Sequence, residues 1–172
     1  VTKSYLLDVY PNIASQLGSR TSPGLFTCGY NRYGTLGNGT TVYYSSPIQV
    51  GSLTNWKQVD CSQSSTAILN TVAAVKTDGS LWTWGYSPLS NASSDSYSSP
   101  IQVGSLTTWK QVACGYSQTS AIKTDGTLWA WGSNNNGQLG NGTTASYSSP
   151  IQVGSLTTWL NTACGYDYAT VT

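Results

Sequence analysis

Aspartate is the main residue type in this sequence that could act as an acid or a base, because the chain contains no histidine and no glutamate. Asp78 and Asp125 each lie in the string Lys-Thr-Asp-Gly, and a pair of carboxylates can share proton transfer. Asp-Gly is also a favoured hairpin turn, since both central residues of a type I′ turn need a positive φ. We interpret both aspartates as turn residues. Without a nucleophile and base constellation, the sequence argues against an enzyme.

Two glycine-rich loops could suggest a phosphate-binding site. Their glycines are Gly34, Gly37, Gly39, Gly137, Gly140 and Gly142. A phosphate-binding loop needs a following Lys-Ser or Lys-Thr and a strand–loop–helix context, and neither occurs in this sequence. We therefore expect these glycines to allow a tight loop path. The sequence implies no cofactor and no metal.

Four cysteines could supply thiols, a disulfide or a metal site. Cys61, Cys114 and Cys164 follow a tryptophan at one constant offset, so they occupy the same position of a repeat. Residues related by repeat symmetry generally lie too far apart for a disulfide, and the spacing contains no CxxC pattern typical of zinc. We predict that these three cysteines and Cys28 are all small buried residues. A Cys28–Cys61 bridge is the alternative.

Seven tryptophans dominate the apolar residues. Trp82 and Trp84 are two residues apart, as are Trp129 and Trp131, which places each pair on one face of a strand. The remaining three are Trp56, Trp109 and Trp159. We expect all of them to pack between neighbouring structural units. A stacking platform for carbohydrate or nucleobases is the alternative interpretation of the paired tryptophans.

The elements that position these residues are set by an internal repeat. The string SYSSPIQVGSLTTW occurs unchanged at 96–109 and at 146–159, and a looser copy, YYSSPIQVGSLTNW, lies at 43–56. The unit is about 50 residues long, which is the size of a propeller blade and too long for an ankyrin or leucine-rich unit.

Within the repeat, short alternating segments predict β-strands. LWAWG at 128–132, PIQV at 150–153, WKQVAC at 109–114 and TSAIK at 119–123 are separated by turn signals, and no helical period appears inside the repeats. Each cycle therefore offers four short antiparallel strands, which make one blade. The middle unit lacks the GQLGNGT element in its loop 86–99.

These residues now point to a family. GSNNNGQLGNGTT at 132–144, preceded by KTDGTLWAWG and followed by WxxxACGY at 159–166, closely resembles the regulator of chromosome condensation repeat. CGYNRYGTLGNGTT at 28–41 keeps much of the same pattern. The resemblance covers about residues 25–172 and implies a β-propeller, typically with seven blades of four strands.

The repeats are offset with respect to whole blades. The pattern starts at LFTCG (25–29), which matches LWAWG in the outer half of a blade, and it stops at LNTACGYDYATVT (160–172), which is an inner half. We predict an all-β chain of propeller-type blades of four antiparallel strands. About three blades would form a partial propeller or part of a larger ring, since propellers have 4–8 blades.

This organisation predicts two segments. Residues 24–172 hold three repeats, and residues 1–23 form an irregular N-terminal arm or docking segment. Exposed strand edges invite pairing. We therefore expect other protein subunits to cover the unpaired blade edges, through self-association, another protein or further parts of a longer chain.

Composition limits the classes of partner. Only 8% of the residues are charged, against about 25% in typical soluble domains. A net charge of +1 without basic runs argues against nucleic acid, and no apolar stretch is long enough for membrane insertion. The polar, low-charge composition favours an extracellular or virion-surface location.

The sequence therefore favours a non-enzymatic structural or interaction module of a virion or cell surface. A receptor- or glycan-binding adhesin, or a secreted inhibitor-like propeller, is the alternative, and the absence of histidine argues against guanine-nucleotide exchange. The variable loops 30–44, 86–97 and 133–147 are the candidate binding surface. Their candidate partner-binding residues are Tyr30, Asn31, Tyr33, Tyr43, Tyr44, Tyr86, Asn91, Tyr97, Asn134, Asn135, Asn136 and Tyr147.

Overall fold

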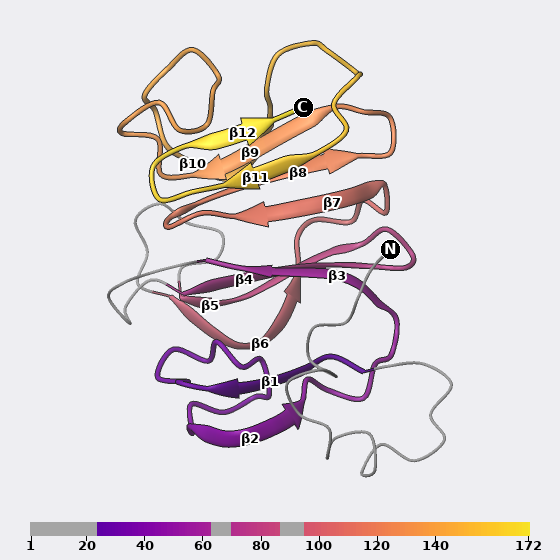
Figure 1. Ribbon diagram of the computed structural model, residues 1–172, viewed down its shortest axis with the longest axis vertical. Coiled ribbons are helices and arrows are strands. Elements are labelled where there is room, and N and C mark those ends of the chain that lie inside the picture. Colours follow the sequence, from indigo (N-terminus) through magenta and orange to yellow (C-terminus); the bar gives the residue numbers. More distant parts are fainter. Residues whose placement is uncertain (1–23, 63–69, 87–94) are drawn as a thin grey trace.

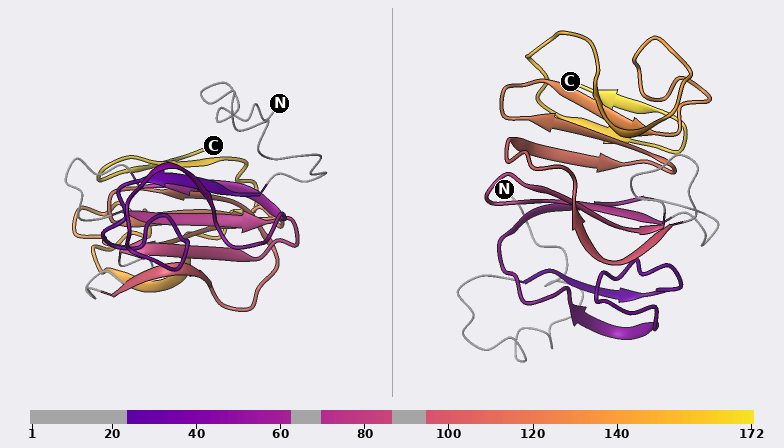
Figure 2. Two further views of the ribbon diagram at one scale, coloured as in Figure 1. Left: turned by 90° about the horizontal axis from the view of Figure 1, so that it is seen from below. Right: turned by 180° about the vertical axis from the view of Figure 1, so that it is seen from behind.

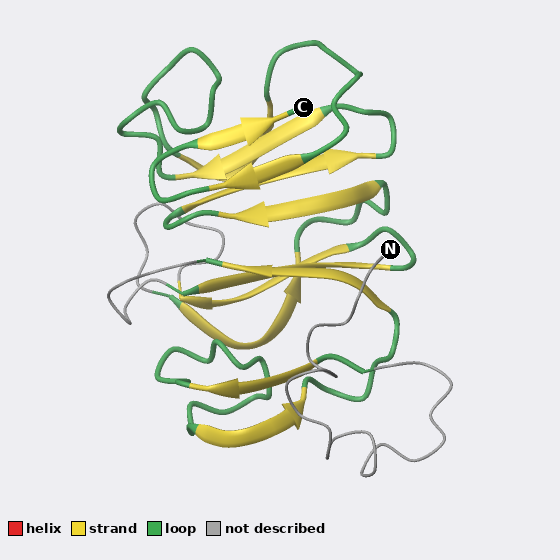
Figure 3. Ribbon diagram, viewed as in Figure 1, coloured by secondary structure: helices red, strands yellow, loops and turns green. Residues whose placement is uncertain are grey.

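The computed structural model describes residues 24–62, 70–86 and 95–172. In this part of the chain all regular elements are strands (Figure 3). They are β1 (Phe26–Gly29), β2 (Tyr44–Gln49), β3 (Trp56–Cys61), β4 (Thr71–Lys76), β5 (Leu81–Tyr86), β6 (Ser96–Gln102), β7 (Trp109–Cys114), β8 (Gln118–Lys123), β9 (Leu128–Gly132), β10 (Tyr147–Gln152), β11 (Thr162–Cys164) and β12 (Ala169–Val171). The predicted N-terminal arm, 1–23, lies outside the described residues.

The strands form two complete four-stranded sheets and two half sheets. β3-β4-β5-β6 and β7-β8-β9-β10 are antiparallel sheets in chain order, whereas β1-β2 and β11-β12 are two-stranded. β1-β2 has the register of the outer half β9-β10, and β11-β12 has that of the inner half β7-β8. The predicted all-β fold, with four-stranded blades offset by half a blade, is confirmed.

The sheets stack face to face along the chain, from β1-β2 to β11-β12 (Figure 1), and the view from behind shows the same succession (Figure 2). β7 contacts both β3 and β11, so these three strands line one side of the stack as its inner strands. A side-chain amide links two of them. Gln58 Nε2 donates to Val112 O at 2.6 Å, and Val112 N donates to Gln58 Oε1 at 2.8 Å.

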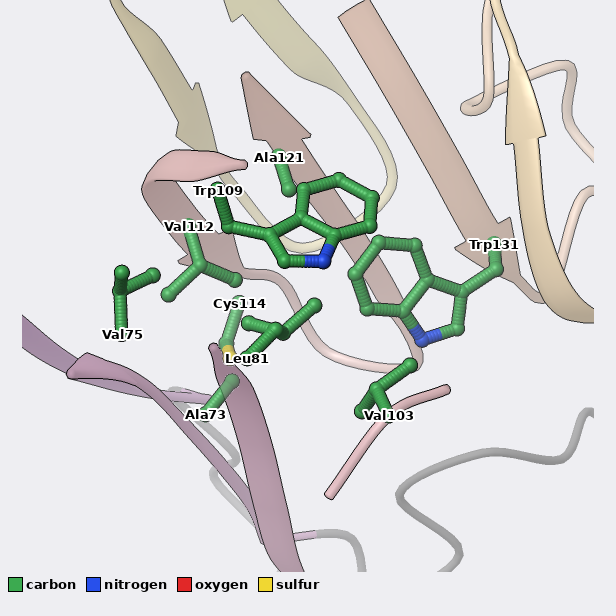
Figure 4. Packing of buried hydrophobic residues seen from close by; sticks show 9 residues of the cluster. All are labelled: Ala73, Val75, Leu81, Val103, Trp109, Val112, Cys114, Ala121 and Trp131. Atoms are coloured by element: carbon green, nitrogen blue, oxygen red, sulfur yellow. The ribbon is translucent and has the colours of Figure 1, made fainter. Parts of the chain in front are cut away.

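Tryptophans fill the space between successive sheets. Between the two complete sheets, Trp109 and Trp131 lie with their ring centroids 6.4 Å apart and pack on Leu81 and Val103 (Figure 4). The preceding junction is built around Trp84, which is completely buried. The expectation that the paired tryptophans pack between blades is therefore met for Trp84 and Trp131. Burying such rings stabilises the stack strongly because each removes a large apolar area from water.

The two junctions differ in how the indole N–H is paired. Trp84 Nε1 donates to Thr35 O at 2.9 Å, on the loop that follows β1. Trp131 Nε1 is buried and has no hydrogen-bond partner in the part of the chain that the structure describes. The sequence of the loops differs in the same way. The loop after β9 contains GQLGNGT and the loop after β1 contains the similar GTLGNGT, whereas the loop after β5 contains neither string.

The cysteines correct one prediction. All four are free thiols, and Cys114 is buried as expected, where burial raises its pKa well above the ordinary value. Cys28 and Cys61 are exposed, and Cys164 is half-buried. The prediction of four buried cysteines was wrong. Cys114 on β7 is covered by the preceding strands β3 and β4. Among the described residues, no sheet precedes the half sheet of Cys28, and no inner half precedes the sheet of Cys61.

The Asp-Gly turns behave as the sequence predicts. Asp78 Oδ1 accepts hydrogen bonds from the Ser80 backbone N–H at 2.9 Å and from Ser80 Oγ at 2.6 Å. Asp125 accepts the same pair of bonds from Thr127, at 3.0 and 2.7 Å. These bonds hold the pKa of both carboxyls below the ordinary value of 3.8.

Acid titration should expose this stabilisation. Because the folded pKa of each turn carboxyl lies below the unfolded one, the stabilisation is complete above the unfolded pKa and is lost as the pH falls through the folded value. When the pH is lowered from about 4 to about 2, the melting temperature of the double variant Asp78→Asn/Asp125→Asn should therefore fall less than that of the parent protein. Half-buried Asp60, whose pKa is raised by desolvation, is retained in both proteins. Identical acid profiles would contradict the assignment.

Candidate functional site

Strand direction gathers half of the loops at one end of every sheet. In each blade the first (inner) and third strands run toward this end. The second and fourth strands run away from it, as the antiparallel registers show. The connections 30–43, 115–117, 133–146 and 165–168 therefore share this end, and loops 30–43 and 133–146 lie on the left of Figure 1. We call this surface the tyrosine face.

All described tyrosines lie at this end. The sequence has 12 tyrosines, of which Tyr5 and Tyr10 fall outside the described residues. The other ten lie in a connection at this end or within two residues of a strand end that faces it; they are Tyr30, Tyr33, Tyr43, Tyr44, Tyr86, Tyr97, Tyr116, Tyr147, Tyr166 and Tyr168. The sequence distributes them over three repeats, and only the alternation of strand direction brings them onto one surface.

Several of these tyrosines are paired. Tyr116 and Tyr166 stack with ring centroids 4.1 Å apart, and Tyr30 and Tyr43 lie 4.8 Å apart. A hydrogen bond with Tyr116 raises the pKa of Tyr166, so its hydroxyl stays neutral. Tyr43, at 56% exposure, and Tyr166, at 51%, offer much of their surface to a partner. The paired rings give this end an aromatic surface.

A further pair closes the face near the first junction. The rings of Tyr33 and Tyr86 meet edge to face at 5.0 Å, and the guanidinium of Arg32 lies 5.6 Å from the Tyr33 centroid. Tyr86 belongs to β5 and Tyr33 to the loop after β1, so the pair joins adjacent units of the stack. The loops of the tyrosine face therefore support one another across blade boundaries.

Two predicted binding residues have a different role. Asn31 and Asn134 are completely buried. Asn134 Nδ2 donates to Thr143 O and Ala145 O, both at 2.9 Å, and Asn134 Oδ1 accepts from Leu139 N at 2.9 Å. Asn31 makes the equivalent bonds within loop 30–43. Both amides hold the shape of their own loop, so the prediction that they contact a partner was wrong.

The other predicted residues lie at the tyrosine face with varied exposure. Tyr30, Tyr43, Tyr97, Asn135 and Asn136 are exposed. Tyr33, Tyr44, Tyr86 and Tyr147 are half-buried. Asn91 lies outside the described residues. Sequence reasoning missed Tyr116, Tyr166 and Tyr168, although the repeated string Cys-Gly-Tyr gave a signal for the first two.

The opposite end of the sheets carries lysines held by tryptophans. Lys76 Nζ lies 3.4 Å from the Trp82 ring centroid and 4.8 Å from that of Trp56. Lys123 repeats this arrangement with Trp129 and Trp109, at 3.5 and 5.0 Å. Both lysines are buried, and burial lowers their pKa. Cation–π contacts of this kind hold the charge of these two lysines inside the blade.

The described residues were compared with the requirements of a metal cluster and of a membrane-spanning helix. No group of three or more His, Cys, Asp or Glu residues in ranges 24–62, 70–86 and 95–172 is placed to hold a metal ion. Within the same ranges, no helix has the length and apolar character needed to cross a membrane.

Comparison with protein families identifies the repeat. The model described as "Regulator of chromosome condensation (RCC1) repeat" matches residues 24–69, 78–122 and 125–171. A second model of the same repeat matches residues 109–138. Together the matched ranges cover most of the chain.

Solved structures show the same fold at low sequence identity. Prp20p from Saccharomyces cerevisiae, described with its binding properties to Gsp1p and histones, is 15% identical with a TM-score of 0.67, over 86% of this chain and 39% of that one. Yeast RCC1 (Prp20) bound to Kap60 gives 16% identity and a TM-score of 0.66, over 86% and 37%. Human WBSCR16 gives 17% identity and a TM-score of 0.54, over 86% and 52%.

This chain thus spans between about two-fifths and one half of the length of these propellers. The four-stranded sheets, their offset halves and three matched repeat units agree with one another. The chain belongs to the regulator of chromosome condensation repeat family.

Proposed function

We propose that this chain is a non-catalytic protein-interaction module that binds a protein partner through the tyrosine face. The observation that carries the proposal is the gathering of ten tyrosines at one end of a stack of rigid sheets. Tyrosine offers a large amphipathic contact area at a low cost in conformational entropy, which suits protein recognition. The stacked and edge-to-face pairs already restrict several rings, so less freedom is lost on binding.

The nature of the face favours a protein partner. It carries few charges: Arg32 and Asp167 have opposite signs, and the two lysines Lys76 and Lys123 are held at the opposite end. The similar yeast propeller was described with protein partners, Gsp1p and histones, and proteins are also the class proposed for this chain. The absence of histidine and glutamate supports a binding role over an enzymatic one, including nucleotide exchange.

The second part of the proposal is assembly at a virion or cell surface. Among the described residues, β1 and β12 each pair with one strand only, and unpaired strand edges favour coverage by other protein subunits. The low charge content is typical of hydrogen-bonding extracellular or virion surfaces rather than of cytosolic domains. Receptor or glycan attachment is the alternative, supported by the stack of half-buried Tyr116 and exposed Tyr166, since aromatic rings also pack against sugars.

Paired variants on opposite ends test the tyrosine face. Partners are first isolated from a virion or cell-surface fraction of the source and purified, and their affinity for the chain is measured by surface plasmon resonance. Tyr43→Ser/Tyr97→Ser should weaken binding by about tenfold or more, because exposed tyrosines often carry much of the affinity. The matched control is Leu53→Ser/Leu106→Ser, which changes comparably exposed side chains at the opposite end.

Two outcomes would contradict this function. Equal loss of affinity in the control would place the contact elsewhere on the molecule. Binding to a glycan array, lost in the tyrosine variant while purified proteins fail to bind, would favour the attachment alternative.

A further inference from the structure

We propose that the free edge of β12 pairs with the free edge of β1 of a second copy, so that two chains complete each other's half blades. This inference rests on the assembly part of the proposed function and names its partner. It does not involve the tyrosine-face residues Tyr43 and Tyr97, so the two proposals can fail separately.

The first argument is that the two half sheets are complementary. Within the described residues, β12 pairs only with β11, and β1 pairs only with β2. In the complete blades, the strand equivalent to β12 pairs with the strand equivalent to β1, as β8 does with β9. β11-β12 of one copy and β1-β2 of another therefore contain the four strands of one blade in the correct order.

The repeat alignment also gives the register of the new pair. β8 and β9 pair Thr119 with Trp131 and Ser120 with Ala130. Their equivalents would pair Ala169 with Cys28 and Thr170 with Thr27 between the two copies. In the other complete blade, β4 and β5 pair Ala73 with Thr83 at the position equivalent to Ser120 and Ala130.

The second argument is the exposure of residues whose repeat equivalents are buried. Val59 on β3 is 43% exposed, whereas its equivalent Val112 on β7 is 1% exposed. Val112 is covered by Ala73 and Val75 of the preceding sheet. Val59 has no such covering sheet among the described residues. The inner half β11-β12 of a second copy would supply it.

The third argument is the open space beside each edge. A Cβ on Gly132 would lie 2.4 Å from Ser117 O, and one on Gly85 would lie 2.2 Å from Asn70 O, both across the neighbouring strand. Gly29 has the same left-handed backbone but nothing within 4 Å. Among the described residues, no atom occupies the equivalent position beside β1, as expected where a strand of another copy fits.

A cavity marks the matching position at the other end. Next to the free edge of β12, a cavity of about 360 Å³ is lined by residues that include Gln138, Trp159, Ala169 and Val171. At the equivalent place in the first junction, the ring of Trp84 contacts the loop at Gly37. In the proposed pair this space receives Cys28 and Phe26 of the second copy, which stand where the complete blades have tryptophans.

Two copies give a closed ring of plausible size. The described residues of each copy bring three inner and three outer halves, so in two copies joined at both ends these halves make six blades. Closed propellers have 4–8 blades, and a head-to-tail contact that closes avoids the open filament that such contacts otherwise produce.

An engineered disulfide tests the register. In the complete blade, Lys76 N donates to Ser80 O and Tyr86 N donates to Asn70 O, so the alternation of hydrogen-bonded pairs leaves Ala73 and Thr83 as a non-hydrogen-bonded pair. Such pairs have Cα atoms about 4.5 Å apart, within the range of a disulfide. Thr27→Cys and Thr170→Cys, prepared separately with different tags, should therefore form a disulfide-linked heterodimer on mixing and mild oxidation.

The controls separate this register from random oxidation of the native thiols. Each variant alone should give at most about a tenth of the linked product that the mixture gives. The same limit is expected for Thr27→Cys mixed with Val171→Cys, because residue 171 points to the other face of the strand. The double variant Thr27→Cys/Thr170→Cys should migrate without reductant as two chains of 18.2 kDa each. Val59→Asp, a change at a residue exposed in the single chain, should abolish the linked product.

Three results would overturn the proposal. The first is equal cross-linking in the register control. The second is a single-chain mass at all concentrations by native mass spectrometry together with no cross-link. The third, a ladder of longer products from the double variant, would overturn closure by two copies. Loss of partner binding at the tyrosine face would not change any of these readouts.

Discussion

Replacing Trp84 by alanine should lower the free energy of unfolding by about 3–5 kcal/mol, a large part of the stability of a typical domain. Trp84 is completely buried and packs with Leu25, Val50 and Val72 at the first junction. Its loss leaves a cavity between two sheets and an unpaired carbonyl at Thr35. Equilibrium urea unfolding followed by far-ultraviolet circular dichroism measures the change.

The matched comparison is between phenylalanine variants of two equivalent tryptophans. Trp84→Phe and Trp131→Phe remove the same ring atoms from the same repeat position, but only Trp84 Nε1 has a described hydrogen-bond partner. Trp84→Phe should therefore cost about 1 kcal/mol more than Trp131→Phe. Equal costs would show that the bond to Thr35 contributes nothing to stability.

The second large effect is expected at Asn134. Asn134→Ala should lower the free energy of unfolding by about 2–4 kcal/mol, because it removes one amide that satisfies several backbone groups of loop 133–146. Thr143 O, Ala145 O and Leu139 N all lose a partner. The same unfolding measurement applies, and faster amide exchange at Leu139 should accompany the loss.

The neighbouring residue provides the control. Asn135 is of the same type, lies next in the chain and is exposed, so Asn135→Ala should change stability by no more than about 0.5 kcal/mol. A similar loss in both variants would contradict the internal role of Asn134. A difference would show that one asparagine of the run builds the loop and leaves its neighbours free to contact a partner.

Trp84 and Asn134 have different structural roles in the repeat. Trp84 holds one sheet against the next, and Asn134 holds the loop that projects beyond the sheet edge. Neither side chain reaches the surface. Loops of a repeat protein generally tolerate more variation than its sheets, so a binding surface built on loops can change while the fold is kept.

Most of the fold could be predicted from the sequence, because it depends on local patterns. Alternating strings such as WKQVAC became strands, the Lys-Thr-Asp-Gly strings became hairpin turns, and the offset of LFTCG and LNTACGYDYATVT became two half sheets. Strand alternation and turn chemistry act over a few residues, and the repeat copies them. The candidate site was only partly predictable, since it includes Tyr116, Tyr166 and Tyr168, which lie outside the predicted loops.

By itself, the sequence determined the unit of structure: a four-stranded blade, repeated three times with a half-blade offset. Only the tertiary structure decided the environment of each copied residue. Cys61 is exposed where Cys114 is buried, and Asn134 is buried beside exposed Asn135. The physical reason is that burial depends on neighbours distant in the chain, which differ between identical repeat positions. For the same reason, only the assembled sheets placed the tyrosines on one face and left two complementary edges.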